Sequence, residues 1–129
     1  MEQIRVAPVS IEKIASIITR KSFAFLQDIG PVARRLLGER IIWNVNSTAQ
    51  GGGVAEMLQP ILAYVRSMDV DVRWVVIGGT SEFFDITKRI HNNIHGHEGD
   101  GGSLGPQEQR IYQEVLARNA ESFSRHIRE

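Results

Sequence analysis

The sequence predicts an α/β fold with a parallel βαβ core and additional helices at both ends. Two apolar segments, Arg40–Asn46 and Val70–Ile77, have the length and branched composition of strands. Between them, Val54–Met68 carries apolar residues at helical spacing. Strand, helix and strand in this order form a βαβ unit, whose strands are parallel by default. Because Arg40–Asn46 is almost continuously apolar, we expect that strand to be covered on both faces.

Further elements are expected on either side of this core. They are a weak third strand at Gln3–Val9, helices at Ser10–Asp28 and Pro31–Leu37, a helix from Thr80 or Ser81 to about Gly96, and a long helix from Pro106. Gly30–Pro31 is expected to separate the first two helices, because proline removes a backbone donor. The polar, glycine-rich segment His95–Pro106 predicts a flexible loop. Since a typical sheet has about five or six strands, residues 1–129 are interpreted as a single partial domain.

Composition excludes several classes of function. Fifteen basic side chains balance fifteen acidic ones, so we expect no binding to nucleic acid or to an anionic membrane. The chain has no cysteine, which excludes disulfides and thiolate metal sites and is compatible with a reducing cytoplasm. No signal sequence is evident at the start, and no apolar run approaches the ~20 residues of a membrane span. We therefore expect a cytoplasmic protein.

Three consecutive glycines, Gly51–Gly53, lie between the first strand and the following helix. Ligands bind at the carboxyl ends of parallel strands, where a helix N-terminus favours an anion and a glycine allows close approach to the backbone. A sharp turn with tight helix–strand packing is the structural alternative, and three glycines in a row favour the ligand interpretation. Glu56, just behind them, is either a ligand of a sugar hydroxyl or a solvated first-turn acid, and both interpretations stay open.

The glycine run does not fit the common nucleotide motifs. Val54–Ala55 follows it where a phosphate-binding loop has Lys and Ser or Thr, and the spacing is not G-x-G-x-x-G. Ile77 and Gly78 stand where an acidic residue would hold an adenosine ribose. We therefore do not expect a nicotinamide-dependent dehydrogenase, and no cofactor is expected.

Three histidines, His91, His95 and His97, lie within seven residues. The first two stand four residues apart, a spacing at which two imidazoles on one helix face can chelate zinc. Solvated histidines near a helix C-terminus are the commoner arrangement. We therefore predict no metal site.

Three blocks of the sequence together resemble a known family. They are "WNVNSTAQGGGVAEML" (Trp43–Leu58), "RWVVIGG" (Arg73–Gly79) and "EFFDITKRIHNNIHG" (Glu82–Gly96). In this order and spacing they resemble the N-terminal part of trehalose synthases that are retaining glycosyltransferases, which join glucose from a nucleotide-diphosphate glucose to free glucose. The resemblance extends from Arg40 to about Ser124 and is looser in the glycine-rich loop.

The resemblance implies a GT-B enzyme, with two Rossmann-like domains facing a cleft. The N-terminal domain would mainly hold the acceptor, and its glycine loop would approach the diphosphate and transferred sugar of the donor. The substrate-binding residues expected on this basis are Asn46, Ser47, Gly51, Gly52, Gly53 and Glu56. Gly52 and Gly53 would offer backbone N–H groups, and Asn46, Ser47 and Glu56 would contact sugar hydroxyls.

The family's His-Asp-Pro-Gln-Pro motif and its donor-binding C-terminal domain have no counterpart among these residues. We therefore identify no catalytic residue and expect no glucosyl transfer by this chain alone. The ligands expected at the glycine loop are glucose or a nucleotide-glucose, and the C-terminal domain is an expected partner. A rival hypothesis makes the chain a non-catalytic α/β module that self-associates through its helices, and a homo-oligomer is expected because so small a sheet leaves exposed edges.

Overall fold

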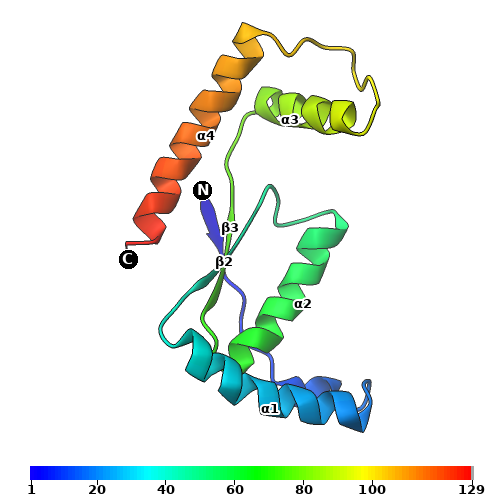
Figure 1. Ribbon diagram of the computed structural model, residues 1–129, viewed down its shortest axis with the longest axis vertical. Helices are drawn as coiled ribbons and strands as arrows, with labels where there is room; N and C mark the ends of the chain where they lie inside the picture. Colours follow the sequence, from blue (N-terminus) through cyan, green and yellow to red (C-terminus); the bar gives the residue numbers. More distant parts are fainter. Residues whose placement is uncertain (129) are drawn as a thin grey trace. The chain divides into compact units, whose positions relative to one another are not determined.

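The computed structural model describes residues 1–128. The elements are β1 (Glu2–Ile4), the short 3-10 helix η1 (Ile11–Ile14), α1 (Arg20–Leu37), β2 (Ile42–Asn46), α2 (Gly53–Ser67), β3 (Val72–Val76), α3 (Ser81–Ile94) and α4 (Pro106–His126) (Figure 1). They form two compact units. One contains residues 2–76, and the other contains Met1 together with the residues from Ile77 onward.

The first unit is built on a mixed sheet with the strand order β1-β3-β2. β2 and β3 are parallel, with Ile42 opposite Val72 and Asn46 opposite Val76, so the predicted parallel βαβ unit is confirmed. β1 pairs with β3 in the antiparallel direction and is limited to Glu2–Ile4, shorter than the expected Gln3–Val9. The arrangement is α/β and compatible with a partial Rossmann-like domain.

β3 is the buried centre of this unit, and β2 is its exposed edge. The apolar core consists of Val6, Ala55, Leu62, Ala63, Val70, Val72 and Trp74. In contrast, Ile42 is 39% exposed and Val45 is 47% exposed, although their side chains point to opposite faces of β2. The expectation that this strand is covered on both faces was therefore wrong. An apolar run alone does not distinguish a central strand from an edge strand, since neighbouring strands and helices decide how much of it is covered.

The N-terminal helices also differ from the prediction. Ser10 accepts a hydrogen bond from the Glu12 N–H and caps only η1, while Thr19 caps a separate helix, α1. α1 then continues through Gly30 and Pro31, so the predicted break there was wrong. Gly30 is buried where an added Cβ would lie 3.3 Å from Cβ of Met68, so this glycine allows close packing against the end of α2. Proline costs the helix one backbone donor, and packing of this kind compensates.

The second unit is a pair of helices, α3 and α4. Phe83, Ile86 and Val115 are its buried apolar residues, and the rings of Phe83 and Tyr112 stack with centroids 5.7 Å apart. A long loop joins the two helices, as Figure 1 shows. Among the described residues, no helix combines the length and the apolar character needed to cross a membrane.

Arg89 of α3 binds the loop between α3 and α4. The Arg89 guanidinium donates to both carboxylate oxygens of Asp100, at 2.7 and 2.8 Å, and to the Ser103 carbonyl at 2.5 Å. This ion pair holds the pKa of Asp100 well below its usual range. Glu108 then accepts from the Gly105 N–H and caps α4. The flexibility of residues 95–106 stays a prediction.

Candidate functional site

The predicted site is a turn at the carboxyl end of the parallel strand pair. β2 ends at Asn46, and α2 begins at Gly53. The connecting residues 47–52 therefore lie where α/β sheets bind ligands. The structure places the predicted site residues at the end of β2, in this turn or in the first turn of α2, all within the first unit.

Asn46 fastens the turn to the core. Its Oδ1 accepts a hydrogen bond from the indole Nε1 of Trp74, a core residue of β3. Its Nδ2 donates to the Thr48 carbonyl at 2.6 Å. Both ends of this amide are therefore used inside the protein, and the side chain positions the turn.

Thr48 continues this bonding pattern along the turn. Its hydroxyl donates to the Gln50 carbonyl at 2.5 Å and accepts from the Gln50 N–H at 3.1 Å. A hydroxyl that bonds to the backbone two residues on is a local turn device. The chain thus enters the glycine run from a defined direction.

Gly51 and Gly52 are required by the backbone conformation. Their φ angles are +72° and +87°, a region that residues with a Cβ adopt only at a cost. Nothing lies within 4 Å of the Cβ position at either glycine. For these two residues the turn itself is a sufficient explanation, and close helix–strand packing is not.

Gly53 is different, because neither reason applies to it. It is the first residue of α2, its φ is not positive, and a Cβ would meet no atom within 4 Å. At Gly79, in contrast, a Cβ would lie 2.6 Å from Cδ1 of Phe83, so packing demands that glycine. The protein fold places no comparable demand on Gly53.

The N-terminus of α2 carries no side-chain cap. Gly52 is its N-cap residue and supplies no side-chain hydrogen bond. Thr19 caps α1 and Thr80 caps α3. α4 resembles α2 in following a glycine without a side-chain cap, but there the Glu108 carboxylate accepts from the Gly105 N–H at 2.9 Å. The first backbone N–H groups of a helix have no partner within the helix, and they carry the positive end of its dipole. At α2 these groups stand beside glycines, so an anionic or hydroxyl-rich ligand can reach them.

Ser47 and Glu56 complete the predicted set. Both side chains are exposed, and neither forms a hydrogen bond to the residues that the structure describes. Glu56 lies in the first turn of α2, and its backbone N–H donates to the Gly52 carbonyl at 3.3 Å. Ser47 and Glu56 are thus the side chains of the predicted set that remain available to a ligand.

Three residues that organise this turn and a second glycine turn, Gly78–Gly79 after β3, were not predicted. Trp74 and Thr48 hold the first turn, and Asn119 holds the second. The Asn119 amide accepts from the Gly78 N–H at 2.9 Å and donates to the Gly78 and Val115 carbonyls at 2.7 and 2.8 Å. It is buried on the apolar side of α4. The sequence signal for this role was a single amide side chain, Asn119, placed four residues after Val115 within the apolar stripe of the helix.

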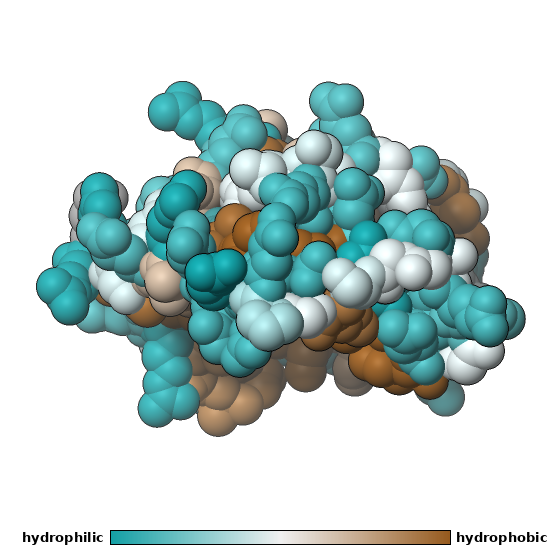
Figure 2. Space-filling model, turned by 90° about the horizontal axis from the view of Figure 1, so that it is seen from above, coloured by the Kyte–Doolittle hydropathy of each residue, from teal (hydrophilic) through white to brown (hydrophobic). Residues whose placement is uncertain are grey.

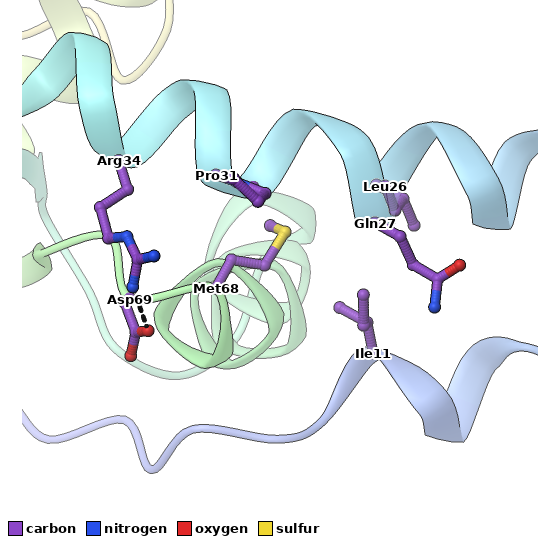
Figure 3. A pocket seen from close by; sticks show the side chains of 8 residues that line it. Ile11, Leu26, Gln27, Pro31, Arg34, Met68 and Asp69 are labelled. Carbon is purple, nitrogen blue, oxygen red and sulfur yellow. Dashed lines mark hydrogen bonds and ion pairs between the residues drawn. The ribbon is translucent and has the colours of Figure 1, made fainter.

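The first unit also contains a hollow of about 250 Å3 next to α1 (Figure 3). Apolar side chains line most of it, and the Arg34–Asp69 ion pair, 2.8 Å long, lies at one side. None of the predicted site residues lines this hollow. Within the part of the chain that the structure describes, no group of three or more His, Asp or Glu side chains is placed to hold a metal ion.

Comparison with known proteins connects this turn to one family. Residues 44–129 match the family described as trehalose synthase, N-terminal domain. The chain is 40% identical over 87 residues to a trehalose synthase of Thermococcus litoralis, and the matched residues cover 67% of this chain and 21% of that protein. It is 35% identical over 109 residues to the trehalose synthase of Rubrobacter xylanophilus, covering 84% and 24%. A trehalose phosphorylase of Pleurotus pulmonarius is 41% identical over 51 residues, covering 40% and 7%.

The chain thus spans about a fifth to a quarter of the length of these trehalose synthases. The family match covers two thirds of the chain and includes the glycine turn, α2, β3, α3 and α4. The chain therefore belongs to the family of trehalose synthase N-terminal domains.

Proposed function

We propose that this chain is the N-terminal, acceptor-side part of a retaining GT-B glycosyltransferase that forms trehalose from a nucleotide-diphosphate glucose and glucose. The observation that carries this proposal is the uncapped N-terminus of α2, which follows Gly51–Gly53 at the carboxyl end of a parallel strand pair. The family of the chain and the names of its relatives support the choice of trehalose as product.

The backbone at the start of α2 is proposed to bind the diphosphate and the transferred sugar. Gly52 and Gly53 present N–H groups without a Cβ to block a phosphate, and Gly53 is not explained by the fold. Negative charge develops on the leaving diphosphate during glucosyl transfer, so fixed N–H dipoles aimed at its oxygens lower the barrier. Ser47 and Glu56 are proposed to bind sugar hydroxyls, and Asn46 to hold the turn that presents them.

The match to trehalose phosphorylases supports a role of this chain with sugars. The chain is similar to proteins named as trehalose synthases and, over 51 residues, to proteins named as trehalose phosphorylases. These two kinds of enzyme have trehalose in common by name. The chain is therefore proposed to serve the sugar, and the nucleotide is proposed to be bound by a C-terminal domain.

In this proposal the chain needs that C-terminal domain for catalysis and does not transfer glucose alone. The cytoplasm is the proposed location, since nucleotide sugars are the proposed donors and the chain has no cysteine.

A second candidate is a non-catalytic module that self-associates through its helices. It is favoured by exposed apolar side chains on and next to α1, where Ile17 is 78% exposed and Phe25 is 62% exposed. Figure 2 shows, on the face it draws, several separate areas of apolar surface between hydrophilic side chains.

The two candidates can be separated by an NMR titration of the chain with glucose, trehalose and UDP-glucose. Specific amide shifts confined to residues 47–56 are expected, and they should be absent in the variant Gly53→Val. If no ligand shifts these amides while dilution changes signals of α1, the interaction module is the better explanation.

A further inference from the structure

We propose that, contrary to the expectation from the sequence alone, His91 and His95 form a two-histidine site for a divalent transition-metal ion at the C-terminal end of α3. This site lies in the second unit and does not depend on the proposed function of the glycine turn. His91 is in the last turn of α3, and His95 is its C-cap residue. Residues four apart lie on one face of a helix, one turn above the other.

The two imidazole rings already lie close together, in a tilted arrangement. Their centroids are 4.4 Å apart, and the ring planes are inclined by 55°. Zinc–nitrogen bonds are about 2.0–2.1 Å long, so two nitrogens on a tetrahedral ion are about 3.3 Å apart. Rings at this separation need only side-chain rotation to direct one nitrogen each at a shared ion.

The ring nitrogens have no competing partner. Neither imidazole forms a hydrogen bond or an ion pair with any residue that the structure describes. Both side chains are exposed, so an ion can approach from solvent without displacing the core. This differs from Asn46 and Asn119, whose polar atoms are all engaged inside the protein.

The position in the helix favours a cation. The last carbonyl groups of a helix carry the negative end of its dipole, and this attracts positive charge in the last turn. Imidazole is a preferred ligand of zinc, copper and nickel, whereas magnesium and calcium prefer oxygen. Because the protein supplies two ligands, water completes the coordination shell, and the site is expected to select metals by the intrinsic order of their affinities.

The test is a calorimetric titration of the whole chain with ZnCl2, NiCl2, CoCl2 and MgCl2, together with NMR of the imidazole protons. We expect one Zn2+ per chain, tighter binding of Ni2+ than of Co2+, and no heat with Mg2+. His91→Ala and His95→Ala should each weaken Zn2+ binding by at least about tenfold, because even outer partners of metal ligands contribute ten- to hundredfold.

The matched control is His97→Ala, which removes a neighbouring exposed histidine outside the pair and should leave Zn2+ affinity unchanged. Circular dichroism of each variant checks the fold, and little change is expected because all three side chains are exposed. Equal Zn2+ affinity of the wild type and the double variant lacking His91 and His95 would overturn the proposal. So would a loss in His97→Ala as large as in the other two.

Discussion

Replacing Gly53 separates a ligand-binding role from a structural role at the glycine turn. Gly53 is the first residue of α2, and nothing lies within 4 Å of the Cβ that valine would add. Removing a glycine where the backbone tolerates a side chain stabilises a protein by about 0.4–1 kcal/mol through the unfolded state. The lower helix propensity of the branched valine side chain offsets roughly half of that stabilisation. The free energy of unfolding of Gly53→Val should therefore stay within about 1 kcal/mol of the wild type.

Two neighbouring substitutions give the contrast. Gly52→Val forces a branched residue to a φ of +87°, and such strain costs of order 1–3 kcal/mol. Gly79→Val places a Cβ 2.6 Å from the buried Phe83 ring, and overpacking of this kind costs about 1–3 kcal/mol. Both variants should melt at lower temperature than the wild type, while Gly53→Val should not.

The assay combines urea unfolding, followed by the fluorescence of Trp43 and Trp74, with the NMR titration of UDP-glucose. Gly53→Val should weaken the ligand response at least about tenfold, which corresponds to about 1.4 kcal/mol. Unchanged binding would refute the ligand role of Gly53. A loss of stability as large as that of Gly79→Val would show instead that the third glycine is structural.

Four further outcomes are expected. The pure chain should show no glucosyl transfer from UDP-glucose to glucose, and release of trehalose would contradict this. The chain should self-associate in light scattering and Phe25→Ser should weaken the association, whereas a monomer mass at high concentration would count against it. Asn46→Ala should lower the free energy of unfolding by about 1–3 kcal/mol in urea melts, because the Trp74 indole N–H loses its acceptor; an unchanged melt would argue against that anchor. The pKa of Asp100 is lowered, first by its hydrogen bond from Arg89, so the ion pair stabilises the fold above about pH 4 and this stability is lost as the pH falls further. Asp100→Asn should flatten this acid dependence of the stability, most visibly at low salt.

The sequence predicted the βαβ core well because two kinds of signal agreed there. Arg40–Asn46 and Val70–Ile77 are apolar and branched, while Val54–Met68 follows helical spacing. The strands of the structure lie inside the predicted segments and are parallel. Local pattern and tertiary packing favoured the same structure in this part of the chain.

The same kind of pattern failed at Gly30–Pro31, where tertiary packing overrides local preference. Both residues oppose a helix, yet Gly30 is buried against Met68, and the helix continues. A partner 38 positions away along the chain cannot be inferred from a window of neighbouring residues. The direction of β1 was likewise open, because the sequence of a three-residue strand does not specify its orientation.

The glycine turn was predicted in position but not in its internal bonding. The glycine run marked the turn, and the structure separates its members into Gly51 and Gly52, required by φ, and Gly53, which is not. Asn46 was expected to contact a sugar hydroxyl, which stays a prediction, and the structure adds bonds of its amide to Trp74 and Thr48. Such a bond depends on the register of β2 against β3, which becomes visible only in three dimensions.

The central place of β3 has a consequence for how the chain folds during its synthesis. Both strands that pair with β3 are synthesised before it, and Glu2 of β1 cannot pair until Val76 has been made, about 74 residues later. At the ~5–20 residues per second of translation, that interval lasts roughly 4–15 s. β2 is made 30 residues before its partner residues in β3, so its own interval is roughly 1.5–6 s. During that time the β2 edge, with Ile42 and Val45, has no strand to pair with and is exposed to other nascent chains. The yield of folded protein should therefore depend on how fast the ribosome reaches the end of β3.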